Sequence, residues 1–186
     1  MHYLVDALKA FLPHSRGTRV TIIDSVMTGT HELILNNAAD IAICGIPAKG
    51  HIAEPICESE LFLVCCPSHS LAKQKVIADE QALAQHLQVV IKDTATHKTA
   101  DTGWLKAEQR WTVSNFHEAK NILKTGICFC WAPAYLVADD IATGELQRLI
   151  LKGSKSRMIQ LSLLVPNRDK QGLASKLLES LILKQH

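Results

Sequence analysis

The sequence predicts an α/β fold. The main evidence is residues 110–149, where short apolar segments alternate with amphipathic ones in the order strand, helix, strand, helix, strand. Strands joined by helices of this length are expected to run parallel, so that helices cover both faces of their sheet. The chain has 186 residues, 47% of them hydrophobic, and a chain of this length can bury about 70% of its unfolded surface. These observations indicate a globular α/β protein of one large domain or two small lobes.

Each element of residues 110–149 has its own local signal. Residues 111–113 are a short apolar strand, and Ser114 follows where a helix N-cap is expected. The next helix has one apolar stripe, formed by Phe116, Ala119, Ile122 and Leu123. Gly126 ends this helix, and residues 127–131 are apolar enough for a buried strand. A second helix is predicted from Pro133, at the position where proline is tolerated best, to Gly144.

The chain before this unit also alternates helices and strands. Residues 1–12 form a predicted helix whose apolar face carries Leu4, Leu8 and Phe11. A strand over 18–24 and a helix over 28–37 follow. Residues 40–46 are then predicted as a buried strand, and 56–66 as a longer extended segment.

Five further segments complete the prediction. A short helix over 79–86 leads into a strand over 87–92. Residues 93–103 are the most polar loop of the chain and show no periodicity. Residues 158–165 alternate as a strand does, with Ile159, Leu161, Leu163 and Val165 on one face. An amphipathic helix with Leu173, Leu177, Leu178 and Leu181 closes the chain.

Composition excludes several classes of protein. The net charge of +2 is too small for a nucleic-acid surface, which usually has a clustered basic face. No stretch approaches the roughly 18 consecutive apolar residues of a membrane helix, and the N-terminus lacks the pattern of a secretory signal. The six cysteines do not form a CxxC motif, the spacing that is typical of metal-binding cysteines, so no structural metal site is expected. Cys44, Cys128 and Cys130 lie in apolar strands and are predicted to be buried thiols, whereas Cys65 and Cys66 suggest an alternative, a thiol-based redox switch.

Several segments occur in an order that one family shares. They are residues 126–133 (GICFCWAP) between a capped helix and a helix that ends in TGEL, 31–34 (HELI) before 39–43 (ADIAI), and 61–64 (LFLV) before 67–72 (PSHSLA). Together they resemble the effector-binding domain of LysR-type transcriptional regulators. The resemblance covers nearly the whole chain, although Ser70 stands where the family has a proline.

The resemblance implies two Rossmann-like lobes joined by two crossover hinge strands, similar to type II periplasmic binding proteins. Lobe I would comprise 1–66 with 164–186 and lack its first strand, and lobe II would comprise 67–163. The winged helix-turn-helix of the family is absent from this chain, so DNA would be contacted only through that missing N-terminal domain. The resemblance also implies a homodimer or homotetramer with head-to-tail pairing, and a small-molecule effector in the cleft between the lobes.

Candidate ligand-binding residues lie where predicted strands end and helices begin, because ligands of open α/β sheets bind at the carboxyl ends of the strands. Hydroxyls and helix N-termini in this setting favour anions such as carboxylates. The candidates are Ser25, Met27, Thr28, Ile46, Pro47, Asp93, Thr94, Thr96, Ser114 and Asn115. The family usually has a small hydroxyl residue where this chain has Met27. The alternative interpretation is that Thr28 and Ser114 only cap helices.

No catalytic site is predicted. His97 lies in the same loop as Asp93, but no nucleophile stands beside it at a recognisable spacing. We therefore expect a non-enzymatic, cytoplasmic ligand sensor that uses no cofactor and no metal and does not contact a membrane. The alternatives are a periplasmic type II solute-binding protein, a thiol-based redox-sensing regulator, or a small α/β enzyme.

Overall fold

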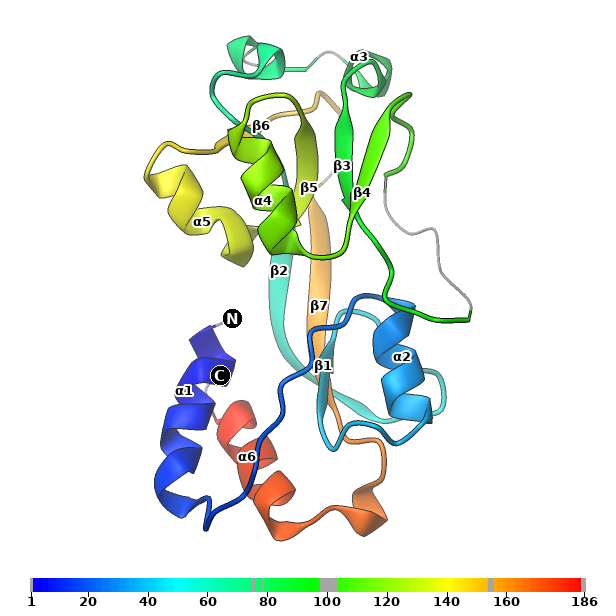
Figure 1. The fold of residues 1–186 in the computed structure, drawn as a ribbon, viewed down its shortest axis with the longest axis vertical. Coiled ribbons are helices and arrows are strands. Elements are labelled where there is room, and N and C mark those ends of the chain that lie inside the picture. Colours follow the sequence, from blue (N-terminus) through cyan, green and yellow to red (C-terminus); the bar gives the residue numbers. More distant parts are fainter. Residues whose placement is uncertain (1, 75, 78, 98–103, 154–155, 185–186) are drawn as a thin grey trace. The chain divides into compact units, whose positions relative to one another are not determined.

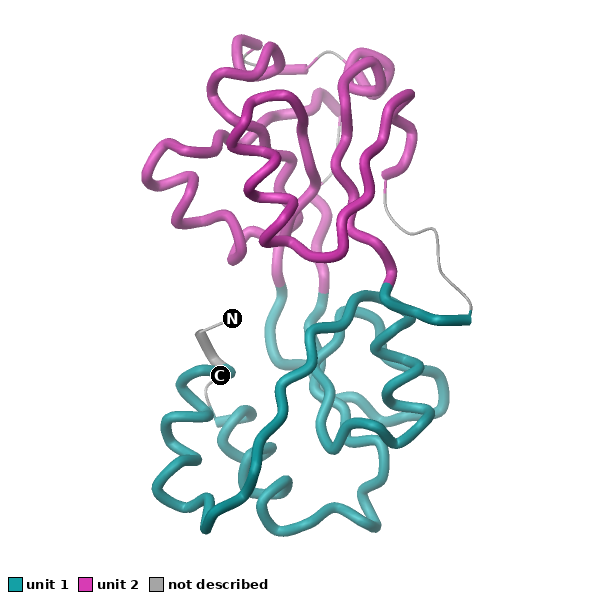
Figure 2. Tube along the Cα trace, viewed as in Figure 1, with its two compact units in different colours: residues 1–58, 94–99, 160–186 teal, residues 59–93, 100–159 magenta. Residues whose placement is uncertain are grey.

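The chain folds into two compact units of mixed α/β structure (Figures 1 and 2). The computed structural model describes residues 2–74, 76–77, 79–97, 104–153 and 156–184. Unit 1 comprises Met1–Glu58, Thr94–Thr99 and Gln160–His186, and unit 2 comprises Ser59–Asp93 and Ala100–Ile159. Hydrogen bonds link the strands in the order β1 (Ala42–Cys44), β7 (Arg157–Leu164), β2 (Ala53–Cys65), β5 (Phe129–Pro133), β3 (Gln88–Ile91) and β4 (Arg110–Val113), and β6 (Gln147–Leu149) pairs with β2.

Unit 1 is built around two helices and a short strand pair. Its elements are α1 (His2–Phe11), η1 (Leu12–His14), α2 (Thr28–Leu35), β1 (Ala42–Cys44), the start of β2 (Ala53–Cys65), the end of β7 (Arg157–Leu164), η3 (Arg168–Lys170) and α6 (Leu173–Leu183). β1 pairs antiparallel with β7, with Ala42 opposite Leu164. α1 packs beside α6, and Ala7, Leu163 and Ile182 form the buried centre of this packing (Figure 1). The predicted first and last helices are therefore confirmed, although Leu173 at the start of α6 is exposed.

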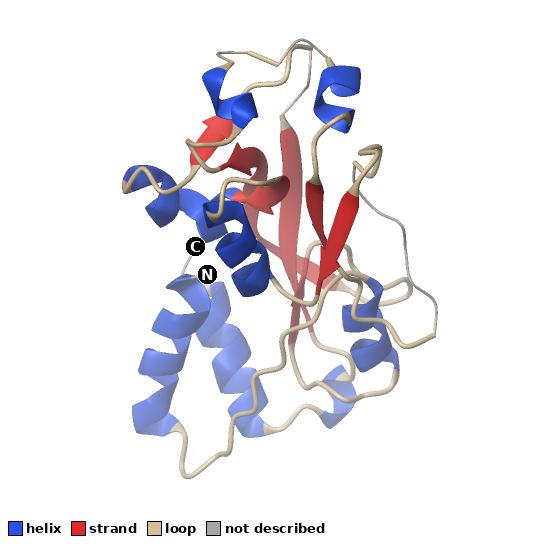
Figure 3. Ribbon diagram, turned by 45° about the horizontal axis from the view of Figure 1, so that its top comes forward, coloured by secondary structure: helices blue, strands red, loops and turns tan. Residues whose placement is uncertain are grey.

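Unit 2 contains the parallel crossovers that the sequence predicts. Its elements are the end of β2, η2 (Ser70–Lys73), α3 (Glu80–Ala84), β3 (Gln88–Ile91), β4 (Arg110–Val113), α4 (Phe116–Lys124), β5 (Phe129–Pro133), α5 (Ala134–Ala142), β6 (Gln147–Leu149) and the start of β7. β3 lies between β4 and β5 and is parallel to both, so α4 crosses from one to the other. β2 is antiparallel to both β5 and β6. Figure 3 shows α4 and α5 beside these strands.

The two faces of the strands in unit 2 bury separate apolar clusters. Val64, Val89, Leu123, Cys128 and Cys130 belong to the cluster that contains residues of α4 and α5. The second cluster includes Leu63, Cys65, Leu83, Trp104 and Phe129. Because neighbouring residues of a strand point to opposite faces, Val64 and Cys65 fall into different clusters. The predicted burial of Cys44, Cys128 and Cys130 is confirmed.

The helix caps differ from the prediction by one residue. Asn115, not Ser114, is the N-cap of α4, and its side chain accepts a hydrogen bond from the Glu118 amide at 2.9 Å. Pro133 is likewise the N-cap of α5 rather than its first residue. Gly126 and Gly144 follow their helices with φ of +80° and +77°, as expected for glycines that end a helix.

The predicted strand over residues 18–24 is wrong. The segment belongs to no strand, and all seven of its residues are exposed. Val20, Ile22 and Ile23 have the β-branched side chains that favour strands, but they are 46%, 61% and 53% exposed. A strand forms only where a neighbour supplies hydrogen bonds and apolar contacts, and this segment has no strand pairing among the described residues.

None of the described helices is long and apolar enough to cross a membrane.

Candidate functional site

The start of α2 carries three of the candidate residues. Thr28 is the first residue of the helix, and Met27 before it has φ of +51° and ψ of −119°. This φ is uncommon for a residue with a side chain, and such strained positions are often found at functional sites. The Ser25 hydroxyl lies 2.8 Å from the hydroxyl of Thr30 in the first turn of the helix. The local backbone thus holds several hydroxyls around one helix N-terminus.

The segment 94–97 is hydrogen-bonded to the start of this helix, although it is more than sixty residues away in the sequence. The Thr94 hydroxyl accepts a hydrogen bond from the Val26 amide at 2.8 Å and donates one to the Val26 carbonyl at 3.1 Å. Gly29 permits this approach, because a Cβ there would lie 1.9 Å from Thr94 Oγ1 and 2.7 Å from the Thr94 carbonyl carbon. We call the segment 94–97 the strap.

Glu32 holds the other end of the strap. Its carboxylate accepts hydrogen bonds from the Thr96 amide and the Thr96 hydroxyl, each at 2.8 Å, and from the His97 amide at 3.0 Å. The backbone hydrogen bond from Thr96, followed by that from His97, lowers the pKa of Glu32 below its ordinary value of 4.5. Glu32 therefore binds the strap as a carboxylate.

A second loop reaches the same helix. His31, the residue of α2 that precedes Glu32, has its Nε2 2.7 Å from the carbonyl oxygen of Ile46. This contact places the candidates Ile46 and Pro47 beside α2. Both of these loop residues are exposed. Unit 1 thus gathers seven of the ten candidates around one helix: Ser25, Met27, Thr28, Ile46, Pro47, Thr94 and Thr96.

The other three candidates belong to unit 2. Asn115 caps α4 through its side chain, and the Ser114 hydroxyl donates a hydrogen bond to the Glu118 carboxylate at 2.8 Å. Both side chains therefore have structural partners, but the alternative that Thr28 and Ser114 cap helices is wrong, because the N-caps of α2 and α4 are Met27 and Asn115. Asp93, which immediately precedes the strap, is 6% exposed.

The sequence did not identify Gly29, His31 and Glu32 as residues of this site. Glycine inside a helix is unfavourable by about 1 kcal/mol relative to alanine, so Gly29 in the first turn of α2 was a signal of close packing. His31 and Glu32 gave no such signal, because their partners are distant in the sequence.

The chemistry of this helix start suits ligand binding rather than catalysis. The hydroxyls of Ser25, Thr30 and Thr94 lie at the start of α2, where the positive end of the helix dipole stabilises negative charge. The part of the chain that the structure describes contains no group of three potential metal ligands.

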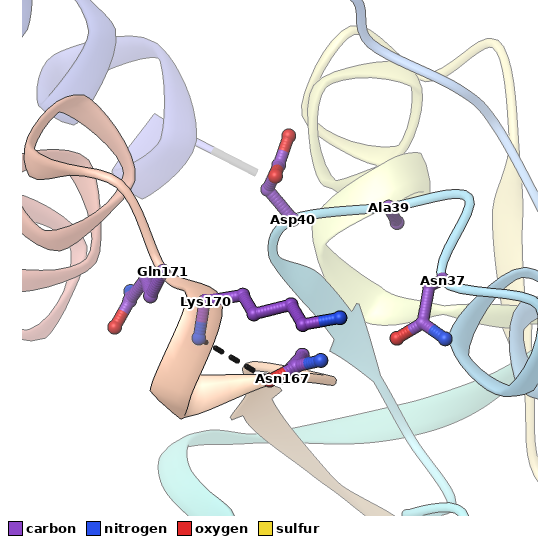
Figure 4. Close-up of a pocket in the computed structure, with 6 residues that line it drawn as sticks. All are labelled: Asn37, Ala39, Asp40, Asn167, Lys170 and Gln171. Carbon is purple, nitrogen blue, oxygen red and sulfur yellow. Dashed lines mark hydrogen bonds between the residues drawn. The ribbon is translucent and has the colours of Figure 1, made fainter.

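Unit 1 also has a polar pocket of about 250 Å³ that contains none of the ten candidates (Figure 4). It is lined by Asn37, Ala39, Asp40, Asn167, Lys170 and Gln171. The Lys170 amide donates a hydrogen bond to Asn167 Oδ1 at 3.3 Å, which holds the turn beside the pocket.

Solved regulatory domains share this fold. The CcmR regulatory domain of Synechocystis PCC6803 in complex with 2-PG is 13% identical, with a TM-score of 0.79 over 99% of this chain and 91% of that one. The effector-binding domain of QuiR in complex with shikimate is 14% identical, with a TM-score of 0.72 over 99% of this chain and 90% of that one. The chain therefore has the mixed α/β fold of these regulatory domains.

Sequence comparison gives the family. The model of the LysR substrate binding domain matches residues 1–185, and this chain belongs to that family. Its members are regulatory and non-catalytic, in agreement with the expectation of a non-enzymatic protein. The chain is also 24% identical over 154 residues to the uncharacterized HTH-type transcriptional regulator YeeY of Escherichia coli (strain K12). That match covers 77% of this chain and 48% of YeeY, so the chain spans about half the length of this relative.

Proposed function

We propose that this chain is the effector-binding and oligomerisation domain of a LysR-type transcriptional regulator and that it binds a small anion at the start of α2. The family match supports the regulatory role. The observation that supports this site is the strap, in which the Thr94 hydroxyl is hydrogen-bonded to residue 26 and the Thr96 hydroxyl to Glu32. A small carboxylate is one of the anions that a helix N-terminus binds. Shikimate, the ligand in the QuiR complex, is a carboxylate of this kind.

The two units correspond in this proposal to the two Rossmann-like lobes of a type II periplasmic-binding-protein fold. The passage of β2 and β7 through both units supports this assignment, because these strands would be the two crossover hinge strands. An effector that prefers one arrangement of the lobes would shift the population toward it. A contact of Ser114 and Asn115 with the effector stays a prediction.

The proposed regulator is a cytoplasmic homodimer or homotetramer that contacts DNA through a separate helix-turn-helix domain. The relative YeeY is named an HTH-type regulator and is about twice as long as the matched region, which supports a second domain in the whole protein. Size-exclusion chromatography with light scattering tests the oligomeric state, and a monomer at all concentrations would refute this part of the proposal.

The effector site is tested by a thermal-shift screen of the purified chain against small carboxylic and phosphorylated acids, with shikimate included. A ligand at about 100 times its Kd adds roughly 2.7 kcal/mol to the free energy of unfolding, which a thermal shift detects readily. We expect one class of acids to stabilise the protein in a dose-dependent way. Stabilisation by no acid would refute the proposed ligand class.

Two variants then locate the site. We expect Thr28→Val to weaken the binding of the stabilising acid, because it removes a hydroxyl at the start of α2. Thr112→Val is the matched control, since Thr112 is exposed on β4 in unit 2 and should bind the acid as the wild type does. Unchanged affinity in Thr28→Val would place the ligand elsewhere on the protein.

A further inference from the structure

The polar pocket of unit 1 has two walls, which come from segments that are distant in the sequence (Figure 4). One wall is the segment 37–40, which follows α2, and the other is the turn around η3, with Asn167, Lys170 and Gln171. All of the lining residues lie in unit 1, and none of them belongs to the start of α2 or to the strap. The pocket is therefore separate from the effector site proposed above.

Hydrogen bonds hold both walls in place. Asn37 ends α2 with φ of +51°, and its amide donates a hydrogen bond back into the last turn of the helix at 3.1 Å. On the other wall, the Asn167 side chain accepts a hydrogen bond from the Lys170 amide at 3.3 Å. The Gln171 side chain donates a hydrogen bond to the Glu179 carboxylate at 2.6 Å, which holds the turn against α6. The pocket thus lies between two ordered segments.

The wall formed by the η3 turn offers a positive charge and hydrogen-bond donors. Arg168, in the same turn, is already paired with Glu54 and Glu179 at 2.6 and 2.9 Å. No ion pair among the described residues includes the Lys170 ammonium. The Nδ2 group of Asn167 likewise has no hydrogen-bond acceptor within the described part of the chain. This wall can therefore bind a carboxylate.

The wall formed by residues 37–40 has the opposite charge. Asp40 is exposed, and its carboxylate takes part in no ion pair that the described residues form. This wall also follows the C-terminal end of α2, where the helix dipole is negative. In Figure 4 the Lys170 side chain extends from the η3 turn toward Asn37. The pocket thus has one ammonium and one carboxylate that do not pair with each other.

The size and the lining of the pocket indicate a small polar ligand. Its volume is about 250 Å³, whereas the pockets of drug-sized ligands measure about 300 to 1,000 Å³ and are mostly apolar. A water molecule in the liquid takes about 30 Å³, so the pocket has room for more than a single water or ion. Ala39 is the one apolar residue of the lining. A short molecule with charges of both signs suits this pocket best.

We propose that the pocket is a second ligand site, which binds a small zwitterionic amino acid. The carboxylate of the ligand accepts hydrogen bonds from the Lys170 ammonium and from Asn167 Nδ2, and its ammonium group is directed to the Asp40 carboxylate. Both charges must be on one molecule, because a simple acid places an anion near Asp40 and a simple amine places a cation near Lys170. This site shares no residue with the proposed effector site and does not depend on it.

The test is an NMR titration of the isotope-labelled chain with glycine, β-alanine and γ-aminobutyrate. Acetate, propionate and butyrate are the matched acids that lack the amine. We expect at least one amino acid to cause saturable shifts of the Asn37, Asp40 and Lys170 amides, and its matched acid to bind about fivefold more weakly, the upper end for an exposed charge pair. No saturable shift of these amides with any amino acid, or equal affinity for the matched acid, would overturn the proposal. Shifts confined to the start of α2 and the strap would also overturn it.

Two variants at exposed positions separate the roles of the two charges. Lys170→Gln should weaken the binding of the amino acid and of its matched acid by about fivefold. Asp40→Asn should remove the preference for the amino acid over the acid, because Asp40 contacts only the ammonium group. Lys176→Gln is the matched control, since Lys176 is also exposed and in unit 1 but lies on α6 outside the pocket. Unchanged affinity in Lys170→Gln, or an equal loss in Lys176→Gln, would contradict the assignment.

Discussion

Gly29→Ala tests the packing of the strap on α2. In an ordinary helix this change would stabilise the protein by up to about 1 kcal/mol, and Gly29 has no left-handed φ that alanine would resist. The new Cβ, however, would lie 1.9 Å from Thr94 Oγ1 and 2.7 Å from the Thr94 carbonyl carbon. The hydroxyl can rotate away, but the backbone carbon cannot. Overpacking of this kind costs about 1 to 3 kcal/mol, so we expect a net loss of about 1 to 2 kcal/mol in the free energy of unfolding.

The loss is measured by urea denaturation followed by circular dichroism. Hydrogen exchange provides the local readout, since the amides of Thr96 and His97 should exchange faster once the strap is displaced from Glu32. The matched control is Gly172→Ala at the N-cap of α6, also in unit 1, because nothing lies within 4 Å of the Cβ that it would add. We expect the control to lose up to about 1 kcal/mol, because glycine is a better N-cap than alanine, and to leave the exchange of the strap amides unchanged.

A Gly29→Ala protein that is as stable as the wild type, or more stable, would refute this account. Its strap amides would then also be protected as in the wild type, and the close approach of Thr94 to α2 would have no energetic role.

Three further predictions concern single side chains. Glu32→Gln should speed amide exchange in the strap at neutral pH. In the wild type the strap amides should be fully protected from exchange above pH 4.5. This protection should be lost as the pH falls through the folded-state pKa of Glu32, because that pKa is lowered on folding. Protection of these amides that persists in strong acid would contradict this prediction. Asn115→Ala should destabilise the protein by about 1 kcal/mol through loss of the α4 cap, whereas the neighbouring Ser114→Ala should change stability less, and thermal denaturation of both decides. Asp140→Asn should cost about 1.5 to 3 kcal/mol, since the buried carboxylate pairs with two lysines at 2.5 and 2.8 Å; urea denaturation checks this, and a loss below about 0.5 kcal/mol would mean that the pairs contribute little.

The second half of the fold could be predicted because its signals are local. Residues 110–149 contain their own strand propensities, apolar stripes and terminating glycines, and each of the five predicted elements is present. The strand predicted over 127–131 lies two residues later, at Phe129–Pro133. The caps moved by one residue, since Ser114 and Asn115 are both good cap residues and the sequence does not say which of them accepts the hydrogen bond from the Glu118 amide.

Residues 18–24 and the strap could not be predicted, for the same physical reason. Both depend on partners that are distant in the sequence. The propensity of Val20, Ile22 and Ile23 favours a strand, but no strand forms without a neighbour. The polarity of residues 93–103 indicated a loop, yet its hydrogen bonds to residues 26 and 32 follow from the folded arrangement alone. The part of that loop from 98 to 103 lies outside the described residues.

The exposed segment 18–24 has a practical consequence for handling the protein. A stretch of β-branched residues that is extended, exposed and unpaired is a template for aggregation, because another chain can add to it as a strand. Arg19 and Asp24 are the charged residues near its two ends, and charges at such positions oppose stacking of identical segments. Substitutions that remove the charge of Arg19 or Asp24 are therefore expected to increase aggregation of this chain at high concentration.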